Sequence, residues 1–199
     1  GTLTLSGSNT YGGDTTISAG DLVISSESAL GQSELVAIAA DGSLGYGIDG
    51  KDQSSMTYVL SEEGGTIAVV EGKSYKLKGS IDGGSASGGL TKEGKGALTL
   101  SGSNTYGGDT TISAGELVIS SESALGQSKL VAIAGAGSLG YGIDGKDQSS
   151  MAYVLSEQGG TIAVDEGKSY KLKGSLGGGS ARGGLTKEGN GTLTLSGSN

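Results

Sequence analysis

The sequence predicts an all-β protein that folds as a parallel β-helix, a solenoid with about four to five turns in each 95-residue repeat. Residues 1–95 recur as 96–190 without a gap, and a third copy begins at Gly191. Such regular repetition is typical of solenoids. Short segments in which apolar and polar residues alternate indicate half-buried strands. The chain contains no proline, as expected where every interior strand donates its N–H groups to a neighbour.

Each copy holds about nine expected strands, separated by the glycine, serine, asparagine and aspartate residues that form turns. In TLTLS, Leu3 and Leu5 share the inward face, and in SYKLKG Tyr75 and Leu77 do so while the lysines face water. No stretch has a helical period with caps. The strands are expected near Leu3, Thr15, Leu22, Leu35, Leu44, Met56, Thr66, Tyr75 and Gly89.

The spacing of these strands favours a solenoid over tandem sandwiches or a propeller. One expected ladder is Leu22, Leu44, Thr66 and Gly89, and a second is Leu35, Met56, Tyr75 and Leu98. Nine strands in two ladders make four and a half turns per copy, so that successive copies start on opposite faces. The alternative is that some turns carry a third strand.

The two copies differ at twelve positions, and most of the differences change a charge. Only solvent-facing positions tolerate such changes cheaply, so the copies are expected to differ at the surface and share one core. Ile81→Leu176 stays apolar and is expected to be buried. The chain thus divides into repeats 1–95 and 96–190 and the start of a third at 191–199, within one continuous solenoid. The differences include Asp21→Glu116, Glu34→Lys129, Asp41→Ala136, Val70→Asp165, Asp82→Gly177, Ser87→Arg182 and Lys95→Asn190.

The composition excludes several classes of protein. The 42 glycines lack the period of collagen, and the recurring aliphatic runs argue against disorder. A formal charge of −8 with singly spaced lysines argues against nucleic acid as a partner, and the lysines of YKLKG and LTKEG are expected on a solvated face. No apolar run approaches the roughly 18 residues that span a bilayer, so direct membrane insertion is not expected. Without cysteine there are no disulfides, thiol nucleophiles or thiolate metal sites.

The opening stretch of each copy resembles the autotransporter-associated β-strand repeat of bacterial surface passengers, and the lead-in GGLTKEGKG at 88–96 does so too. The resemblance covers about a third of each copy closely. In the first copy it rests on Leu3, Leu5, Gly7, Asn9, Thr10, Tyr11, Gly13, Thr15, Ile17, Gly20 and Leu22. In the second it rests on Leu98, Leu100, Gly102, Asn104, Thr105, Tyr106, Gly108, Thr110, Ile112, Gly115 and Leu117.

This resemblance implies a right-handed parallel β-helix, exported through a C-terminal barrel that this sequence does not contain and tethered to the outer membrane at the cell surface. The chain is then expected to be a segment of a longer adhesin shaft, whose first partners are the neighbouring repeats. Alternatively, the shaft itself could bind a second copy in trans, giving autoaggregation and biofilm, or a host-surface protein or glycan. A polysaccharide-cleaving β-helix enzyme is the remote third alternative.

Catalytic and metal sites are not indicated, and no cofactor is expected. Histidine is absent, and the adjacent carboxylates Glu62 and Glu63 fit a solvated turn better than acid–base chemistry. The loop GYGIDGKDQSS, present in both copies, offers weak calcium candidates. These are Asp49 and Asp52 with Ser54 in the first copy, and Asp144 and Asp147 in the second.

The tyrosines and the glycine-rich segments are given structural roles. The eight tyrosines are the chain's only aromatic residues. They could line a sugar-binding surface, but packing in the core and in the motif is favoured, with the hydroxyl groups turned to water. The segments SIDGGSASGG at 80–89 and SLGGGSARGG at 175–184 are expected to form long loops that act as spacers.

Overall fold

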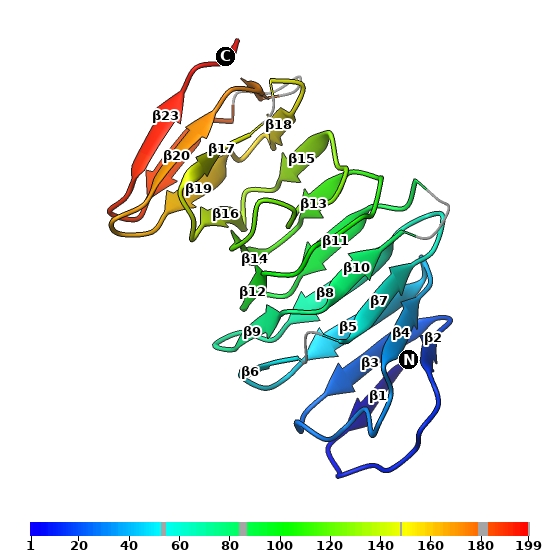
Figure 1. Cartoon of the computed structure of the whole chain (residues 1–199). Coiled ribbons are helices and arrows are strands. Elements are labelled where there is room, and N and C mark those ends of the chain that lie inside the picture. Colours follow the sequence, from blue (N-terminus) through cyan, green and yellow to red (C-terminus); the bar gives the residue numbers. More distant parts are fainter. Residues whose placement is uncertain (53–54, 84–86, 148, 179–182, 199) are drawn as a thin grey trace.

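The computed structural model describes residues 1–52, 55–83, 87–147, 149–178 and 183–198. These residues form 23 strands and no helix. The strands pair in parallel between successive turns, and the chain winds through about eight turns from one end of a rod to the other (Figure 1). The predicted class, an all-β parallel β-helix, is therefore confirmed.

The coil has three sides, which the chain visits in a fixed order. The first side is a nine-stranded sheet of β1 (Thr2–Leu5), β3 (Gly20–Ile24), β5 (Gly42–Tyr46), β8 (Gly65–Val69), β11 (Leu90–Glu93), β13 (Thr110–Ile112), β15 (Leu130–Ile133), β18 (Ala152–Leu155) and β21 (Ser175–Gly177). The second side is a seven-stranded sheet of β6 (Gly50–Lys51), β9 (Ser74–Leu77), β12 (Ala97–Leu100), β14 (Gly115–Ile119), β16 (Gly137–Tyr141), β19 (Gly160–Val164) and β22 (Leu185–Glu188).

The third side holds two smaller sheets. One consists of β2 (Thr15–Ile17), β4 (Leu35–Ile38), β7 (Thr57–Leu60) and β10 (Ser80–Asp82), and the other of β17 (Gly145–Lys146), β20 (Ser169–Leu172) and β23 (Thr192–Leu195). Between these sheets the third side is formed by segments 101–109 and 121–129, which are not strands. The N–H of Thr105 donates to the carbonyl of Ile81, so segment 101–109 stacks directly on β10.

Each copy advances the coil by four turns and one further side. From β1 the chain returns to the first side four times, at β3, β5, β8 and β11, and the second copy then begins with β12 on the second side. The third copy begins with β23 on the third side. The predicted start on opposite faces is therefore wrong, and the alternative, turns with a third strand, is correct. In the first copy the additional strands are β6 and β10, and both are so short that the sequence pattern does not reveal them.

The pairing also corrects the second expected ladder. Leu35 pairs with Thr57 on the third side, whereas Tyr75 pairs with Leu98 on the second side. The expected series from Leu35 to Leu98 therefore joined two different sides. On the first side Leu22 pairs with Leu44, as expected, and Leu44 pairs with Ile67, one residue from the expected Thr66.

The core is a stack of inward rows of leucine, isoleucine, valine and tyrosine along the rod. Leu98 has a strand on each side and is fully buried, whereas Leu3 has one neighbouring strand and is 59% exposed. Val70 is exposed, as expected from its replacement by Asp165, and Ile81 is buried. Glu116 departs from the expected surface position because it is half-buried.

One lysine lies inside this core. Lys92 occupies the inward row of the first side, between Ile67 below and Ile112 above, and is fully buried. The expectation that the lysine of LTKEG faces water is therefore wrong in the first copy. Its counterpart Lys187, on the last turn of the second side, is exposed. The difference arises because β22 has one neighbouring strand and β11 has two.

Candidate functional site

The asparagine of the SGSNTYGG motif joins neighbouring turns, and the tyrosine makes a hydrogen bond within its own turn. Asn104 is buried, and its Oδ1 accepts a hydrogen bond from the N–H of Ile81 (2.8 Å) in the preceding turn. Its Nδ2 donates to the carbonyl of Ala124 (2.5 Å) in the next turn. The hydroxyl of Tyr106 lies 2.8 Å from Oγ1 of Thr110. The motif therefore stabilises the coil, since Asn104 bonds to the turn on either side and Tyr106 bonds within its own turn.

The aspartates predicted as calcium candidates also bind the following turn. Oδ1 of Asp49 accepts from the N–H of Ser74 (2.8 Å), at the start of β9. Asp52 accepts from the N–H of Lys78 and from that of Gly79 (3.1 Å for the latter), just beyond the end of β9. The two carboxylates of one loop thus hold opposite ends of one strand and do not converge on a common point.

The second copy repeats this arrangement. Asp144 and Asp147 accept hydrogen bonds at the two ends of β20. Within the described ranges, no three histidine, cysteine, aspartate or glutamate side chains gather where they could hold a metal ion. Ser54, the third predicted oxygen ligand, lies outside the described residues. Glu62 and Glu63 are exposed in a turn, where sequence analysis expected them.

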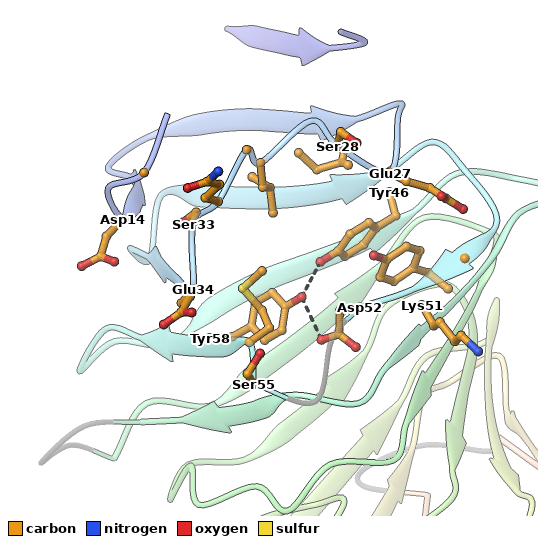
Figure 2. A pocket seen from close by; sticks show the side chains of 18 residues that line it. Asp14, Glu27, Ser28, Ser33, Glu34, Tyr46, Lys51, Asp52, Ser55 and Tyr58 are labelled. Carbon is orange, nitrogen blue, oxygen red and sulfur yellow. Dashed lines mark hydrogen bonds between the residues drawn. The ribbon is translucent and has the colours of Figure 1, made fainter. Parts of the chain in front are cut away.

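A cleft opens in each copy where the stacking of two turns is interrupted. In the first copy, the N–H of Gly47 donates to the carbonyl of Ile24, and the N–H of Thr57 donates to that of Glu34. Between these two bonds, the turn at 25–33 and the segment that contains β6 line a cleft of about 1100 Å³ (Figure 2). β6 pairs with β9 alone among the described strands. Its second edge is therefore left open at the cleft.

Three tyrosines and one aspartate form the floor of this first cleft. The rings of Tyr46 and Tyr75 are stacked with their centroids 3.7 Å apart. The hydroxyl of Tyr58 donates to Oδ2 of Asp52 (3.1 Å) and lies 2.9 Å from the hydroxyl of Tyr46, as the dashed lines in Figure 2 show. These hydrogen bonds join buried side chains beneath the surface of the cleft.

Burial sets the ionisation of the floor. It raises the pKa of Tyr75 to about 12 and the pKa of Tyr46 and Tyr58 well above the usual tyrosine value. Burial also raises the pKa of Asp52, although the hydrogen bonds from Lys78, Gly79 and Tyr58 act in the opposite direction. The phenols therefore stay protonated at physiological pH and can both donate and accept hydrogen bonds.

The rim of the first cleft is polar and mostly acidic. Glu27 and Glu34 belong to the turn at 25–34, Asp14 lies at the same end as Glu34, and Lys51 extends from β6 at the other side (Figure 2). Ser55 projects into the cleft beside the tyrosine floor. The lining thus combines carboxylates, hydroxyls and aromatic rings.

The second copy carries the corresponding cleft, with a volume of about 680 Å³. Tyr141 and Tyr170 stack at 3.7 Å, and the hydroxyls of Tyr141 and Tyr153 lie 3.1 Å apart. Among the positions that line both clefts, the two copies differ in sequence at one, where Lys129 replaces Glu34. One rim is therefore acidic, and the other carries an additional lysine.

The clefts were not predicted from the sequence, and the tyrosine hydroxyls were expected to face water. That expectation is wrong for Tyr46 and Tyr58, whose hydroxyls are buried and bonded to each other. One signal was available in Gly50, which pairs with Tyr75 in the next turn. A Cβ atom at Gly50 would lie 3.2 Å from Cε2 of Tyr75, so the glycine leaves room for the ring.

The passenger-associated-transport-repeat family matches residues 1–24, 90–119 and 185–199. The chain is also 36% identical, over 167 residues, to the adhesin BmaC autotransporter of Brucella suis biovar 1 (strain 1330). This chain carries autotransporter passenger repeats. The alignment with the adhesin covers 83% of the passenger-repeat chain but only 4% of the adhesin. No solved structure shows significant similarity to this chain.

The transport-repeat matches of these passenger repeats cover the stacking motif and reach the lining of the clefts only at Gly12, Asp14, Ile24 and Ile119. The matched ranges hold Asn104, Tyr106 and the buried Lys92, whereas the turn at 25–34 and the tyrosines of the floor lie outside them. Across the part of the passenger-repeat chain that the structure describes, no helix is long and apolar enough to span a membrane.

Proposed function

We propose that this chain is a shaft segment of a bacterial cell-surface adhesin, tethered to the outer membrane through other parts of a longer protein and without enzymatic activity. The observation that carries the proposal is that the coil continues unchanged across the boundary between copies. β11 and β12 belong to adjacent copies, yet each is paired on both edges. A further copy therefore lengthens the rod without rebuilding its core.

The similarity to a named adhesin supports the same role. Most carboxylates of the described residues face solvent singly, and the buried Asp52 and Asp147 hold neighbouring strands, which suits a structural element better than a hydrolase. In this reading the repeats separate a binding region from the cell.

Small-angle scattering on the chain, and on a version with one additional copy of residues 96–190, tests the shaft role. Four turns and one side at about 4.8 Å per turn should lengthen the rod by about 21 Å at constant cross-section. If the additional copy thickened the particle, or left its length unchanged, the proposal would be contradicted. A concentration series distinguishes an extended monomer from rods that associate side by side.

A further inference from the structure

The two clefts are interruptions that a plain spacer does not require. On the first side of the coil, successive turns are joined by continuous backbone hydrogen bonds, as from β3 through β5 to β8. At the cleft this ladder is replaced by an open edge of β6 in the first copy and of β17 in the second. Unpaired backbone groups cost stability unless water or a ligand satisfies them. The gap therefore weakens the rod, which suggests that the cleft has a role other than stacking.

The shape of the open edge disfavours a peptide as the occupant. A peptide that adds a strand needs an edge several residues long. β6 and β17 span two residues each, Gly50–Lys51 and Gly145–Lys146. Strand addition at either site would end after one or two backbone hydrogen bonds.

The lining suits a hydroxyl-rich ligand better. Ser55 and Gln32 place hydroxyl and amide groups around the first cleft, and Glu27 and Glu34 add carboxylate acceptors. The half-buried ring of Tyr75 supplies an aromatic surface at the floor, and aromatic side chains with a polar tip suit ligands that are apolar on one face and polar at the edges. Pockets that hold small organic ligands typically measure about 300–1000 Å³; the second cleft, of about 680 Å³, lies within this range, and the first, of about 1100 Å³, slightly exceeds it.

The rims of the clefts assign a charge preference. Glu34 is joined by Glu27 and Asp14 in the first cleft, where Lys51 is the one lysine. In the second, Lys129 and Lys146 accompany Glu122, and Asp109 is not part of the lining. A cationic ligand is therefore favoured in the first cleft, and the second admits an anionic one.

We propose that each cleft is an oligosaccharide-binding site, with the first favouring amino sugars and the second accepting acidic sugars. The inference goes beyond the shaft role and does not depend on it, because sugar binding and rod length are measured separately. A shaft with such sites would contribute weak contacts repeated along its length.

Isothermal titration calorimetry on the chain tests the sites with three trisaccharides of different charge: chitosan trimer (cationic), trigalacturonate (anionic) and maltotriose (neutral). We expect at least one of them to bind at concentrations below about 10 mM. Ser55→Trp should plug the first cleft and Ser150→Trp the second. Ser87→Trp is the matched control outside the clefts, at a position that holds arginine in the other copy.

The charge assignment has its own test, which uses residues that the chain already tolerates. Glu34→Lys, made with Ser150→Trp, should lower the ratio of chitosan to trigalacturonate affinity about two- to fivefold, and Lys129→Glu, made with Ser55→Trp, should raise it. Each exchange reproduces the residue of the other copy and is also made alone, so that a shift of the affinity ratio in the same direction remains measurable if the tryptophan variants fail to fold.

Three results would overturn the proposal. The first is no binding of any of the three sugars to a chain whose circular dichroism shows intact β-structure. The second is unchanged binding in the Ser55→Trp/Ser150→Trp double variant. The third is binding of an extended hexapeptide with the sequence of residues 57–62 in the absence of sugar binding, which would assign the open edges to a peptide.

Discussion

Replacement of Lys92 by methionine tests how the interior of the coil is held together. Nζ of Lys92 donates to the carbonyls of Glu93 (2.6 Å), Gly94 (2.7 Å) and Ala114 (3.0 Å). Glu93 is the last residue of β11, Gly94 follows it directly, and Ala114 lies in the next turn. The lysine therefore ties two turns together from inside.

Lys92→Met keeps the aliphatic stem and removes all three donors. Hydrogen bonds from a charged donor contribute about 1.5–3 kcal/mol each, but they are not additive, and the cost of burying the ammonium group offsets part of them. We expect a loss of about 2–4 kcal/mol in the free energy of unfolding. Lys187→Met is the matched control. Its lysine is exposed and bonds two carbonyls of its own turn, so the loss should stay below about 1 kcal/mol.

Urea unfolding at several pH values measures both the size and the sign of the effect. Burial lowers the pKa of Lys92 from 10.5 to about 8. Between these values the unfolded chain binds a proton that the folded chain does not, so the pH-dependent part of the contribution of Lys92 grows as the pH rises and is lost as the pH falls through 8, while the contribution of its hydrogen bonds remains. The stability gap between wild type and Lys92→Met should therefore widen from pH 8 to pH 10. Equal stability of the two proteins at pH 7, or a gap that narrows with rising pH, would refute the reasoning.

Three further changes have expected outcomes. Leu98→Ala should cost about 3 kcal/mol in urea unfolding and Leu3→Ala less than about 1, because Leu98 is fully buried and Leu3 is 59% exposed; equal costs would contradict the inward assignment. Asn104→Ala should cost about 2 kcal/mol and speed hydrogen exchange in the flanking turns. Asn9→Ala, which removes one bond, should do less, and identical exchange in both variants would count against the role of the motif. Glu116→Gln should raise the melting temperature at pH 7 but not at pH 3.5. Burial first, then nearby acidic charge, raises the pKa of Glu116, so the stability present at low pH is lost as the pH rises through the folded value; equal shifts at both pH values would argue against burial as the cause.

The strands could be predicted from the sequence because alternation is a local property. Leu3, Leu22 and Leu44 lie in one row of paired residues, as their period-two surroundings predicted. The same rule applies to Lys92, which alternates in phase with the buried Leu90. The pattern thus indicated an inward lysine, and the chemistry of the side chain led to the opposite interpretation. Three carbonyls accept hydrogen bonds from this buried lysine: those of Glu93 and Gly94 belong to LTKEG, whereas that of Ala114 lies in the next turn and is not visible in LTKEG.

The sides of the coil and the clefts could not be predicted in the same way. Which strands pair depends on how far each connecting segment reaches, and β6 and β10 are too short to show a period. The cleft depends on a turn that leaves the stack between Ile24 and Glu34, while the coil closes again at Thr57. Stacking of Tyr46 on Tyr75 joins residues from different turns. Such arrangements result from non-local pairing, for which one sequence carries only indirect signals such as the glycine at position 50.

The extra side gained by each copy bears on what the repeats can do together. Because one copy adds four turns and one of three sides, the second cleft faces a different side of the rod from the first. Three copies would complete thirteen turns, so a fourth copy would bring its cleft back to the side of the first, about 62 Å along the rod at about 4.8 Å per turn. If each copy instead advanced the coil by four and a half turns, the clefts would lie in two opposite rows. The observed geometry distributes them over all three sides, so that a rod could meet a surface in any rotation about its axis and still present a cleft to it.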